Sequence, residues 1–179
     1  MTIETINIGP NGDLQTRLRL YFKPLVEKAI SKQSFNPRID SQFYLVNLLA
    51  SAVRTKNIFM PKAIFNGVEY DEVPIALQYM SAFESDEYNK TGTMKKIGDY
   101  TLFKIGFFPK SFSRKSVKID YYMRMGSSAY STISWKENDL FYELSRHFPL
   151  FCETLWIVSG NDKNKDDLLA RINSDEIMH

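Results

Sequence analysis

Apolar residues recur at helical spacing through most of this chain, and that periodicity limits its fold more than any other sequence feature. Phe43, Val46 and Leu49 illustrate the pattern, because residues three and four apart lie above one another on one face of a helix. The run 140–158 repeats it, and stretches rich in Pro, Gly and Asn separate such runs. The sequence therefore predicts an all-α fold.

We expect a single domain over residues 1–179, because compact domains usually contain about 100–200 residues. Six or seven helices should pack in an irregular orthogonal or bundle-like arrangement. The expected helices lie at 25–30, 40–53, 74–89, 94–107, 117–130, 134–158 and 162–172. Ser134 and Glu137 would form a capping box for the longest one, and Pro149 would kink it.

The N-terminal part of the chain allows two interpretations. Residues 1–13 suit an extended or flexible segment, and residues 18–22 fit either a helix or the second strand of a short N-terminal hairpin. Residues 58–73 include the turn-forming pair Asn66-Gly67 and predict a loop, with a short extended piece at 63–65.

The boundary near residue 90 also follows from turn-forming residues. Lys90-Thr91-Gly92 would close the helix at 74–89, and the next helix would follow it. The apolar spacing in the first of these helices predicts that Leu77, Met80 and Phe83 face inward.

Net charge and cysteine content indicate the compartment. The formal net charge of +2 indicates no particular partner, and Cys152, the only cysteine, has apolar neighbours. We expect it to be a buried hydrophobic side chain. The N-terminus lacks the basic and apolar regions of a signal peptide, and no stretch has the roughly 20 nearly uncharged residues of a membrane span. These features predict a cytoplasmic protein that does not bind membranes.

The common catalytic and cofactor motifs are missing from the sequence. Two histidines and one cysteine cannot form a zinc site without carboxylates, and the chain has no P-loop, Gly-x-Gly-x-x-Gly or Gly-x-Ser-x-Gly motif. Glu143 and His147 lie one helical turn apart, and we interpret them as a partly exposed ion pair. We predict no catalytic residue, metal or cofactor; the sequence leaves enzymatic activity open and favours none.

Charges are segregated along the chain. Residues 63–89 carry six acids and no Lys or Arg, whereas residues 104–124 carry six bases and one acid. The basic segment could bind nucleic acid or phosphate through Lys110, Arg114, Lys115 and Lys118. Alternatively, the two segments could meet within one chain, meet between chains in a homodimer, or simply face solvent.

Glycines and tyrosines in two helices suggest either close packing or a ligand pocket. Gly106, next to two phenylalanines, suits a helix end with positive φ, and Gly126 lies in a run of small residues. Helix packing is the simpler interpretation of such residues. The alternative is an aromatic pocket whose polar groups would be Asp99, Tyr121, Tyr122, Arg124 and Tyr130.

The same segments carry a recognisable pattern. It reads Gly-Asp-x-x-Leu-Phe-x-x-Gly-Phe-Phe over 98–108, Asp-Tyr-Tyr-x-x-Met-Gly-x-x-Ala-Tyr over 120–130 and Phe-x-Glu-Leu-Ser-x-x-Phe over 141–148. This combination resembles an uncharacterised family of soluble helical bacterial proteins. The resemblance implies a soluble, helical, bacterial protein and carries over no activity, cofactor or site residue.

We therefore expect a non-catalytic cytoplasmic binding or interaction module, with residues 104–130 as its surface and an unknown protein as its partner. Nucleic-acid or phosphate binding through the basic segment is the first alternative. A small-molecule or enzymatic pocket near Asp99, Tyr122 and Arg124 is the second.

Overall fold

Seven α-helices build the part of the chain that the structure describes, which confirms the all-α class. The structure is a computed structural model that describes residues 13–54, 63–65, 68–70, 74–112, 119–135 and 139–160. The helices are α1 (Leu14–Ser31), α2 (Ile39–Arg54), α3 (Ile75–Phe83), α4 (Glu87–Phe107), α5 (Ile119–Ile133), α6 (Leu140–Arg146) and α7 (Phe148–Val158). The predicted helix at 162–172 lies outside the described residues.

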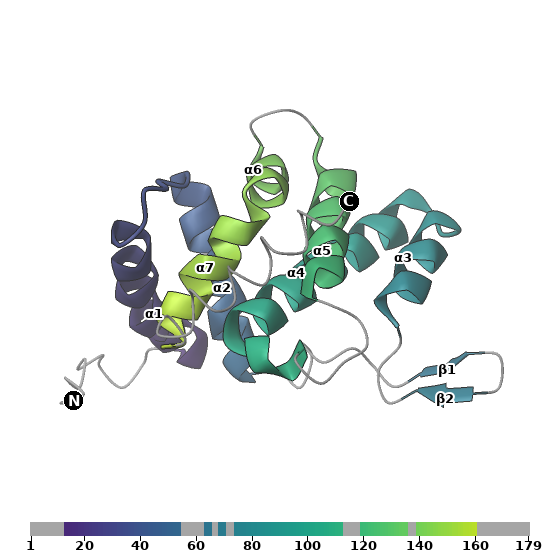
Figure 1. The fold of residues 1–179 in the computed structure, drawn as a ribbon, viewed down its shortest axis with the longest axis horizontal. Helices are drawn as coiled ribbons and strands as arrows, with labels where there is room; N and C mark the ends of the chain where they lie inside the picture. The colour runs from purple at the N-terminus through teal and green to yellow at the C-terminus, as the bar shows by residue number, and fades with distance from the viewer. Residues whose placement is uncertain are drawn as a thin grey trace, which may run out of the picture.

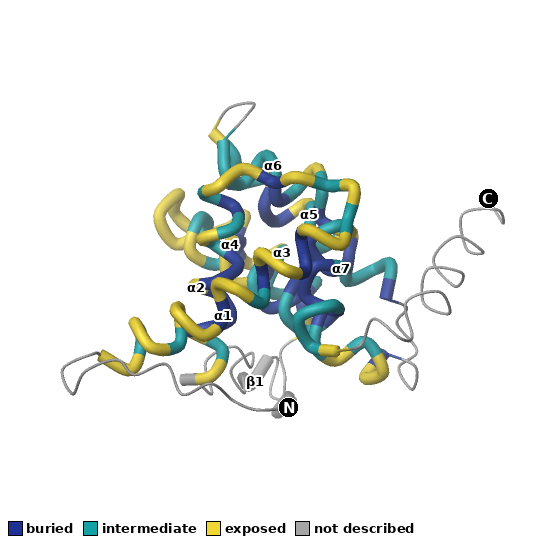
Figure 2. The backbone as a smooth tube through the Cα atoms, turned by 90° about the vertical axis from the view of Figure 1, so that its left-hand side faces the viewer, coloured by how far each residue is buried: buried dark blue, intermediate teal, exposed yellow. Residues whose placement is uncertain are grey.

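Helix α4 is the centre of the arrangement. It packs against α2, α3, α5 and α7, while α1 packs against α2 and α7 at the far end of the molecule from α3 (Figure 1). The buried parts of α4, α5 and α7 lie inside, and exposed helix faces surround them (Figure 2). A short 3₁₀ helix, Pro109–Phe112, follows α4 at the predicted break.

One continuous apolar core joins these helices. Its largest fully buried side chains include Trp156, Tyr130, Phe148 and Phe151. Burying a large apolar side chain stabilises a fold by roughly 1.5–3 kcal/mol. No helix in the described ranges has both the length and the apolar composition needed to cross a membrane.

Helix α1 decides between the two interpretations of residues 18–22. Phe22, Val26, Ala29 and Ile30 are its buried residues, and their spacing of three and four residues places them on one helical face. The helical interpretation is therefore confirmed for 18–22, and the hairpin interpretation of these residues is wrong. Residues 1–12 lie outside the described part of the chain.

The predicted helix at 74–89 is wrong at its C-terminal end. Helix α3 ends at Phe83, and α4 begins at Glu87 and continues through Gly92. Asp86 starts the new helix because its carboxylate accepts a hydrogen bond from the backbone N–H of Asn89 at 3.0 Å. A good N-cap at residue 86 thus overrides the Lys90-Thr91-Gly92 signal.

The inward face predicted for α3 is wrong for Met80 and Phe83, whereas Leu77 is half-buried. Ile75 and Ala82 are buried, whereas Met80 and Phe83 are 64% and 55% exposed. Helix α3 is only nine residues long, and it fully buries Ile75 and Ala82, half-buries Tyr79 and leaves Met80 and Phe83 exposed.

The predicted helix at 134–158 is in fact two helices. Asp139, not Ser134, caps α6 by accepting from the backbone N–H of Tyr142 at 2.6 Å. Ser134 instead donates its hydroxyl hydrogen to Asp139 at 3.1 Å, and Glu137 lies outside the described residues. Pro149 lies in the first turn of α7, where its missing N–H costs nothing.

The loop predicted at 58–73 contains a short hairpin. Strands β1 (Ala63–Phe65) and β2 (Val68–Tyr70) pair antiparallel with Phe65 opposite Val68. The extended piece at 63–65 is thus confirmed, and the second strand was missed. Asn-Gly between two short apolar runs is a typical two-residue hairpin signal, which could have predicted it.

Candidate functional site

Asp99 on α4 collects hydroxyl groups from two neighbouring helices. Tyr130 on α5 donates to Asp99 Oδ1 at 2.8 Å, and Tyr44 on α2 donates to the same oxygen. The other oxygen lies 2.6 Å from Nζ of Lys95, one turn earlier on α4. Asp99 thus ties α2 and α5 to α4.

The two phenols of this cluster are held neutral. Tyr130 is fully buried, and burial, followed by the negative charge of Asp99, raises its pKa well above the ordinary value. The same two causes, in the same order, raise the pKa of Tyr44. Both side chains therefore act as hydrogen-bond donors, and both donate to the same carboxylate oxygen of Asp99.

Glycines in α4 and α5 let large side chains lie against the helix backbone. A Cβ on Gly98 would come within 2.6 Å of Cδ1 of Tyr130, and one on Gly126 within 2.5 Å of Cζ of Phe148. The close-packing interpretation of these small residues is therefore confirmed. Gly106 lies inside α4 against Leu155, so its predicted positive φ at a helix end is wrong.

The remaining pocket candidates lie apart from Asp99. The ring of Tyr122 packs against two other rings. Its centroid lies 4.7 Å from that of Phe112 and 5.6 Å from that of Tyr121. Tyr122 precedes Tyr130 by eight residues, or about 12 Å along the helix. Arg124 is exposed. The structure thus brings Asp99 and Tyr130 together and leaves Tyr121, Tyr122 and Arg124 elsewhere.

The basic segment is described only in part. Lys110 is exposed on the 3₁₀ helix, whereas Arg114, Lys115 and Lys118 lie outside the described residues. The ammonium group of Lys104 lies 4.6 Å from the ring centroid of Tyr100. Phe107, in the same segment, stacks on Phe103, and their ring centroids lie 5.0 Å apart.

Glu143 has a different role from the predicted ion pair. Its carboxylate accepts hydrogen bonds from the backbone N–H of Arg38, at 3.1 and 3.2 Å, and from the hydroxyl of buried Ser41. It therefore caps the N-terminus of α2 from α6. His147 packs instead against Phe35, with ring centroids 5.0 Å apart.

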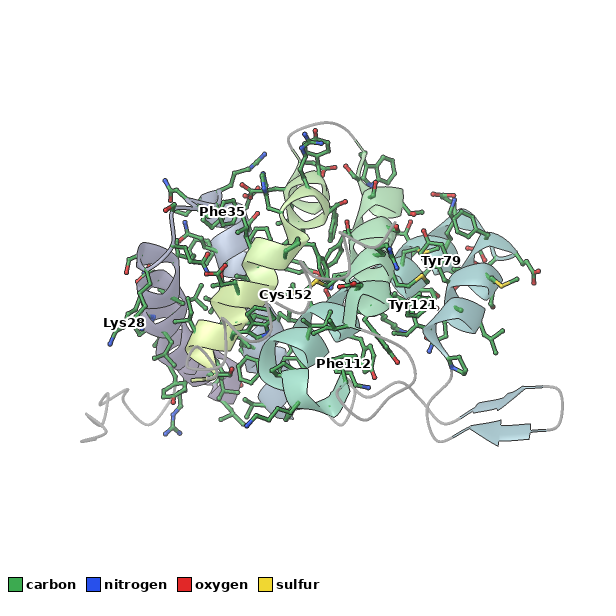
Figure 3. All side chains as sticks on the ribbon, in the orientation of Figure 1. Lys28, Phe35, Tyr79, Phe112, Tyr121 and Cys152 are labelled. Carbon is green, nitrogen blue, oxygen red and sulfur yellow. The ribbon has the colours of Figure 1, made fainter. Side chains whose placement is uncertain are left out.

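An exposed aromatic surface, which sequence reasoning missed, lies where α3, the start of α4 and the end of α5 meet. We call it the aromatic corner and define it by Tyr79, Met80, Phe83, Tyr88 and Trp135. Tyr88 and Trp135 are 88% and 84% exposed. Tyr79 connects the helices because its hydroxyl lies 3.2 Å from that of Thr132, and its ring lies 5.4 Å from that of Phe83. Figure 3 shows Tyr79 at the α3 end of the molecule.

A shallow cleft of about 150 Å³ opens in this corner. It lies between the start of α4 and the end of α5. It is lined by residues of these two helices and by the two residues that follow α5: Glu87, Thr91, Thr132, Ile133, Ser134 and Trp135. The backbone N–H of Trp135 donates to Asp139 at 2.7 Å, so the α6 cap fixes the chain that carries the exposed indole.

The corner is acidic as well as aromatic. Glu84, Asp86 and Glu87 are exposed there, and Lys90 lies 3.6 Å from Glu87 and 5.0 Å from the ring centroid of Phe83. The acidic half of the charge pattern was visible in the sequence. The exposed apolar residues were missed because the spacing of Met80 and Phe83 predicted that they face inward.

Metal chemistry and known relatives give no further assignment. The described residues contain no group of three His, Cys, Asp or Glu side chains able to hold a metal ion. Comparison with protein-family models, curated proteins and solved structures finds no match to this chain. The resemblance to a bacterial helical family therefore stays a prediction.

Proposed function

We propose that this protein is a non-catalytic, cytoplasmic interaction module whose docking surface is the aromatic corner. The observation that carries the proposal is the exposure of Met80, Phe83, Tyr88 and Trp135, each at least 55% exposed, on neighbouring helix ends, with Trp135 also lining the cleft. Contiguous exposed apolar surface usually marks an interaction site. The proposed surface thus lies on α3 and the adjoining helix ends, not on residues 104–130.

The residue types of the corner suit a protein partner. Trp and Tyr are common among the few residues that supply most of the binding free energy at protein interfaces. A single aromatic side chain can bury about 150–250 Å², so the exposed rings at this corner supply an apolar centre. The surrounding carboxylates would form the polar rim of such an interface.

The size of the cleft favours a side chain over a metabolite. Pockets for drug-sized ligands usually have volumes of about 300–1,000 Å³, whereas this cleft measures about 150 Å³. Asp99, the centre of the alternative pocket, is already bound by Tyr44, Tyr130 and Lys95. The described residues also give no specific support to phosphate binding by the basic segment.

Site-specific photocrosslinking in the cells of origin tests the docking surface. A benzoylphenylalanine at position 88 places the reactive ring in the corner, and one at position 21 is the matched control. Tyr21 is also exposed, at 54%, but lies on α1, at the opposite end of the molecule (Figure 1). We expect a defined protein adduct from position 88 only. Equal adducts from both positions, or an adduct from position 21 alone, would contradict the proposal.

A further inference from the structure

We infer that the aromatic corner binds a basic segment of its protein partner, with a Lys or Arg side chain in the cleft beside Trp135 and Glu87. This inference rests on the proposed function and specifies the chemistry of the partner. Apolar residues next to that cation would cover Phe83 and Met80.

The polar groups of the cleft include one carboxylate, on Glu87, and the hydroxyls of Thr91, Thr132 and Ser134, beside the indole N–H of Trp135. Glu87 has an acceptor-only carboxylate at neutral pH. The hydroxyl of Thr132 donates to the backbone carbonyl of Ser128 at 2.8 Å, and that of Ser134 donates to Asp139 at 3.1 Å. These two hydroxyl hydrogens are already used, so the carboxylate of Glu87 is the group of the cleft that selects the occupant. The complementary group is a donor such as an ammonium or guanidinium.

The charge of the corner also favours a positively charged side chain. Among the residues that the structure describes at this corner, three have exposed carboxylates, Glu84, Asp86 and Glu87, and one has an ammonium group, Lys90. The N-terminus of α4 adds only about half a positive charge, so the charges of the described residues at this corner sum to a negative value. Lys95, further along α4, does not offset this charge, because its ammonium group is paired with Asp99 at 2.6 Å. A cation is therefore attracted, and an acidic segment is repelled.

The aromatic rings complete the recognition chemistry. Among the described contacts of the chain, neither Trp135 nor Tyr88 has a ring partner or a cation over its ring. Indole is the best side-chain partner for a cation–π contact. Lys90, placed between the carboxylate of Glu87 and the ring of Phe83, already shows this combination holding an ammonium group within the corner.

A designed peptide provides the test. The probe is a 14-residue amphipathic peptide of leucine and lysine, compared with peptides in which every lysine is replaced by glutamine or glutamate. Binding to the full chain is measured by calorimetry. We expect the lysine peptide to bind, and the glutamine and glutamate peptides to bind at least about tenfold more weakly.

Matched variants locate the bound peptide. W135A should weaken binding of the lysine peptide about tenfold, and E87Q should weaken it measurably. Y21A and E27Q should leave it unchanged, because Tyr21 and Glu27 are exposed on α1, and Glu27 has a lysine partner at 3.5 Å as Glu87 has Lys90. All four positions are exposed, so circular dichroism should show the same fold. Equal losses at α1 and at the corner would overturn the inference.

Two results separate this inference from the proposed function. If the glutamine peptide binds as tightly as the lysine peptide and W135A abolishes both, the corner is a docking surface but the basic occupant is wrong. If the lysine peptide does not bind while position 88 still crosslinks to a partner, the inference again fails and the proposed function stands. Absence of both peptide binding and crosslinking refutes both.

Discussion

At the scale of single residues, Asp99 holds three helices in register with one carboxylate. Two of its hydrogen bonds come from tyrosines on α2 and α5, and its ion pair comes from Lys95 on its own helix. Because Tyr130 is fully buried, its hydroxyl has no water to replace a lost partner. The carboxylate is therefore a structural group, although the sequence alone made it a candidate ligand.

Removing the acceptor should cost more than changing its charge. We expect Asp99→Ala to lower the free energy of unfolding by about 2–4 kcal/mol, because it leaves buried phenol hydroxyls unpaired. Asp99→Asn keeps an amide oxygen that can accept, so its loss should be clearly smaller. Urea unfolding of both variants measures the difference. Equal losses would show that charge, not hydrogen bonding, holds the cluster together.

The raised pKa of Tyr130 predicts a loss of stability in alkali. Above a pH of about 10, the hydroxyl of a tyrosine in the unfolded chain loses its proton. The hydroxyl of Tyr130 keeps its proton in the folded protein. The unfolded state then binds fewer protons, and stability falls by roughly 1.4 kcal/mol per pH unit for this group. This contribution is fully present below pH of about 10.

Tyr130→Phe is the matched variant, because it keeps the ring against Gly98 and removes the titrating hydroxyl. Its free energy of unfolding should be lower at pH 8 but should fall less steeply between pH 10 and 11 than that of the wild type. Urea titrations across this range test the prediction, and parallel curves would show that Tyr130 titrates normally.

Sequence reasoning identified Asp99 and Tyr130 but could not find their shared partner. Tyr44 lies 55 residues from Asp99 along the chain, and no local spacing connects them. Glu143 is a similar case, since it meets Arg38 from 105 residues away. Long-range polar partners depend on how the helices pack, which periodicity within one helix does not specify.

At the scale of elements, two glycines in α4 have opposite surroundings. Gly98 lies under the ring of Tyr130, which also stacks 5.7 Å from Phe141, whereas nothing lies within 4 Å of a Cβ built on Gly92. We expect Gly98→Ala to lower the melting temperature and the free energy of unfolding by at least about 1–3 kcal/mol, because the enclosed ring must move.

Gly92→Ala is the control for that prediction. It should stabilise the protein by about 0.5–1 kcal/mol, because alanine loses less backbone entropy in a helix than glycine. Thermal unfolding of the two variants should thus shift in opposite directions from the wild type. A stabilising Gly98→Ala would mean that the contact between α4 and α5 is looser than described.

Helix existence was easier to predict than helix ends. Each predicted helix between residues 25 and 158 overlaps a helix of the structure, because apolar periodicity reports the buried face. The predicted ends were wrong where two signals competed. Asp86 caps α4 before Gly92, and Pro149 lies in the first turn of α7 where a kink was expected. Local caps decided both boundaries.

The pattern that resembles a bacterial family corresponds to contacts between elements. Gly98 and Gly126 let rings pack on α4 and α5, Phe141 stacks on Tyr130, and Glu143 caps α2. Its residues therefore account for how this fold is built. The aromatic corner is formed by residues outside the pattern, so its binding chemistry cannot be inferred from the resemblance.

At the scale of the whole molecule, the two ends differ in the residues that they expose. The corner lies at the α3 end, and α1, which carries Arg17, Arg19, Lys23 and Lys28, lies at the other (Figure 1). The apolar core connects both ends, since its buried residues run from Phe22 on α1 to Ala82 on α3. This continuity suggests that the ends unfold together.

We therefore predict a single cooperative unfolding transition. Trp156 reports on the core, because it is 2% exposed and its indole N–H donates to the carbonyl of Ile105 at 2.6 Å. The other tryptophan, Trp135, is exposed, and Trp135→Phe removes it so that Trp156 is the single tryptophan probe. Circular dichroism reports on all helices, those of the α3 end included.

In this variant, fluorescence and circular dichroism should give the same midpoint and the same slope in urea, as a two-state transition requires. The reason is that α4 contacts α3 at one end and α7, which carries Trp156, at the other. Loss of either contact removes support from the shared core. A helical signal that falls before the Trp156 signal would show that α3 and its neighbours unfold independently, and the single-domain interpretation would then be wrong.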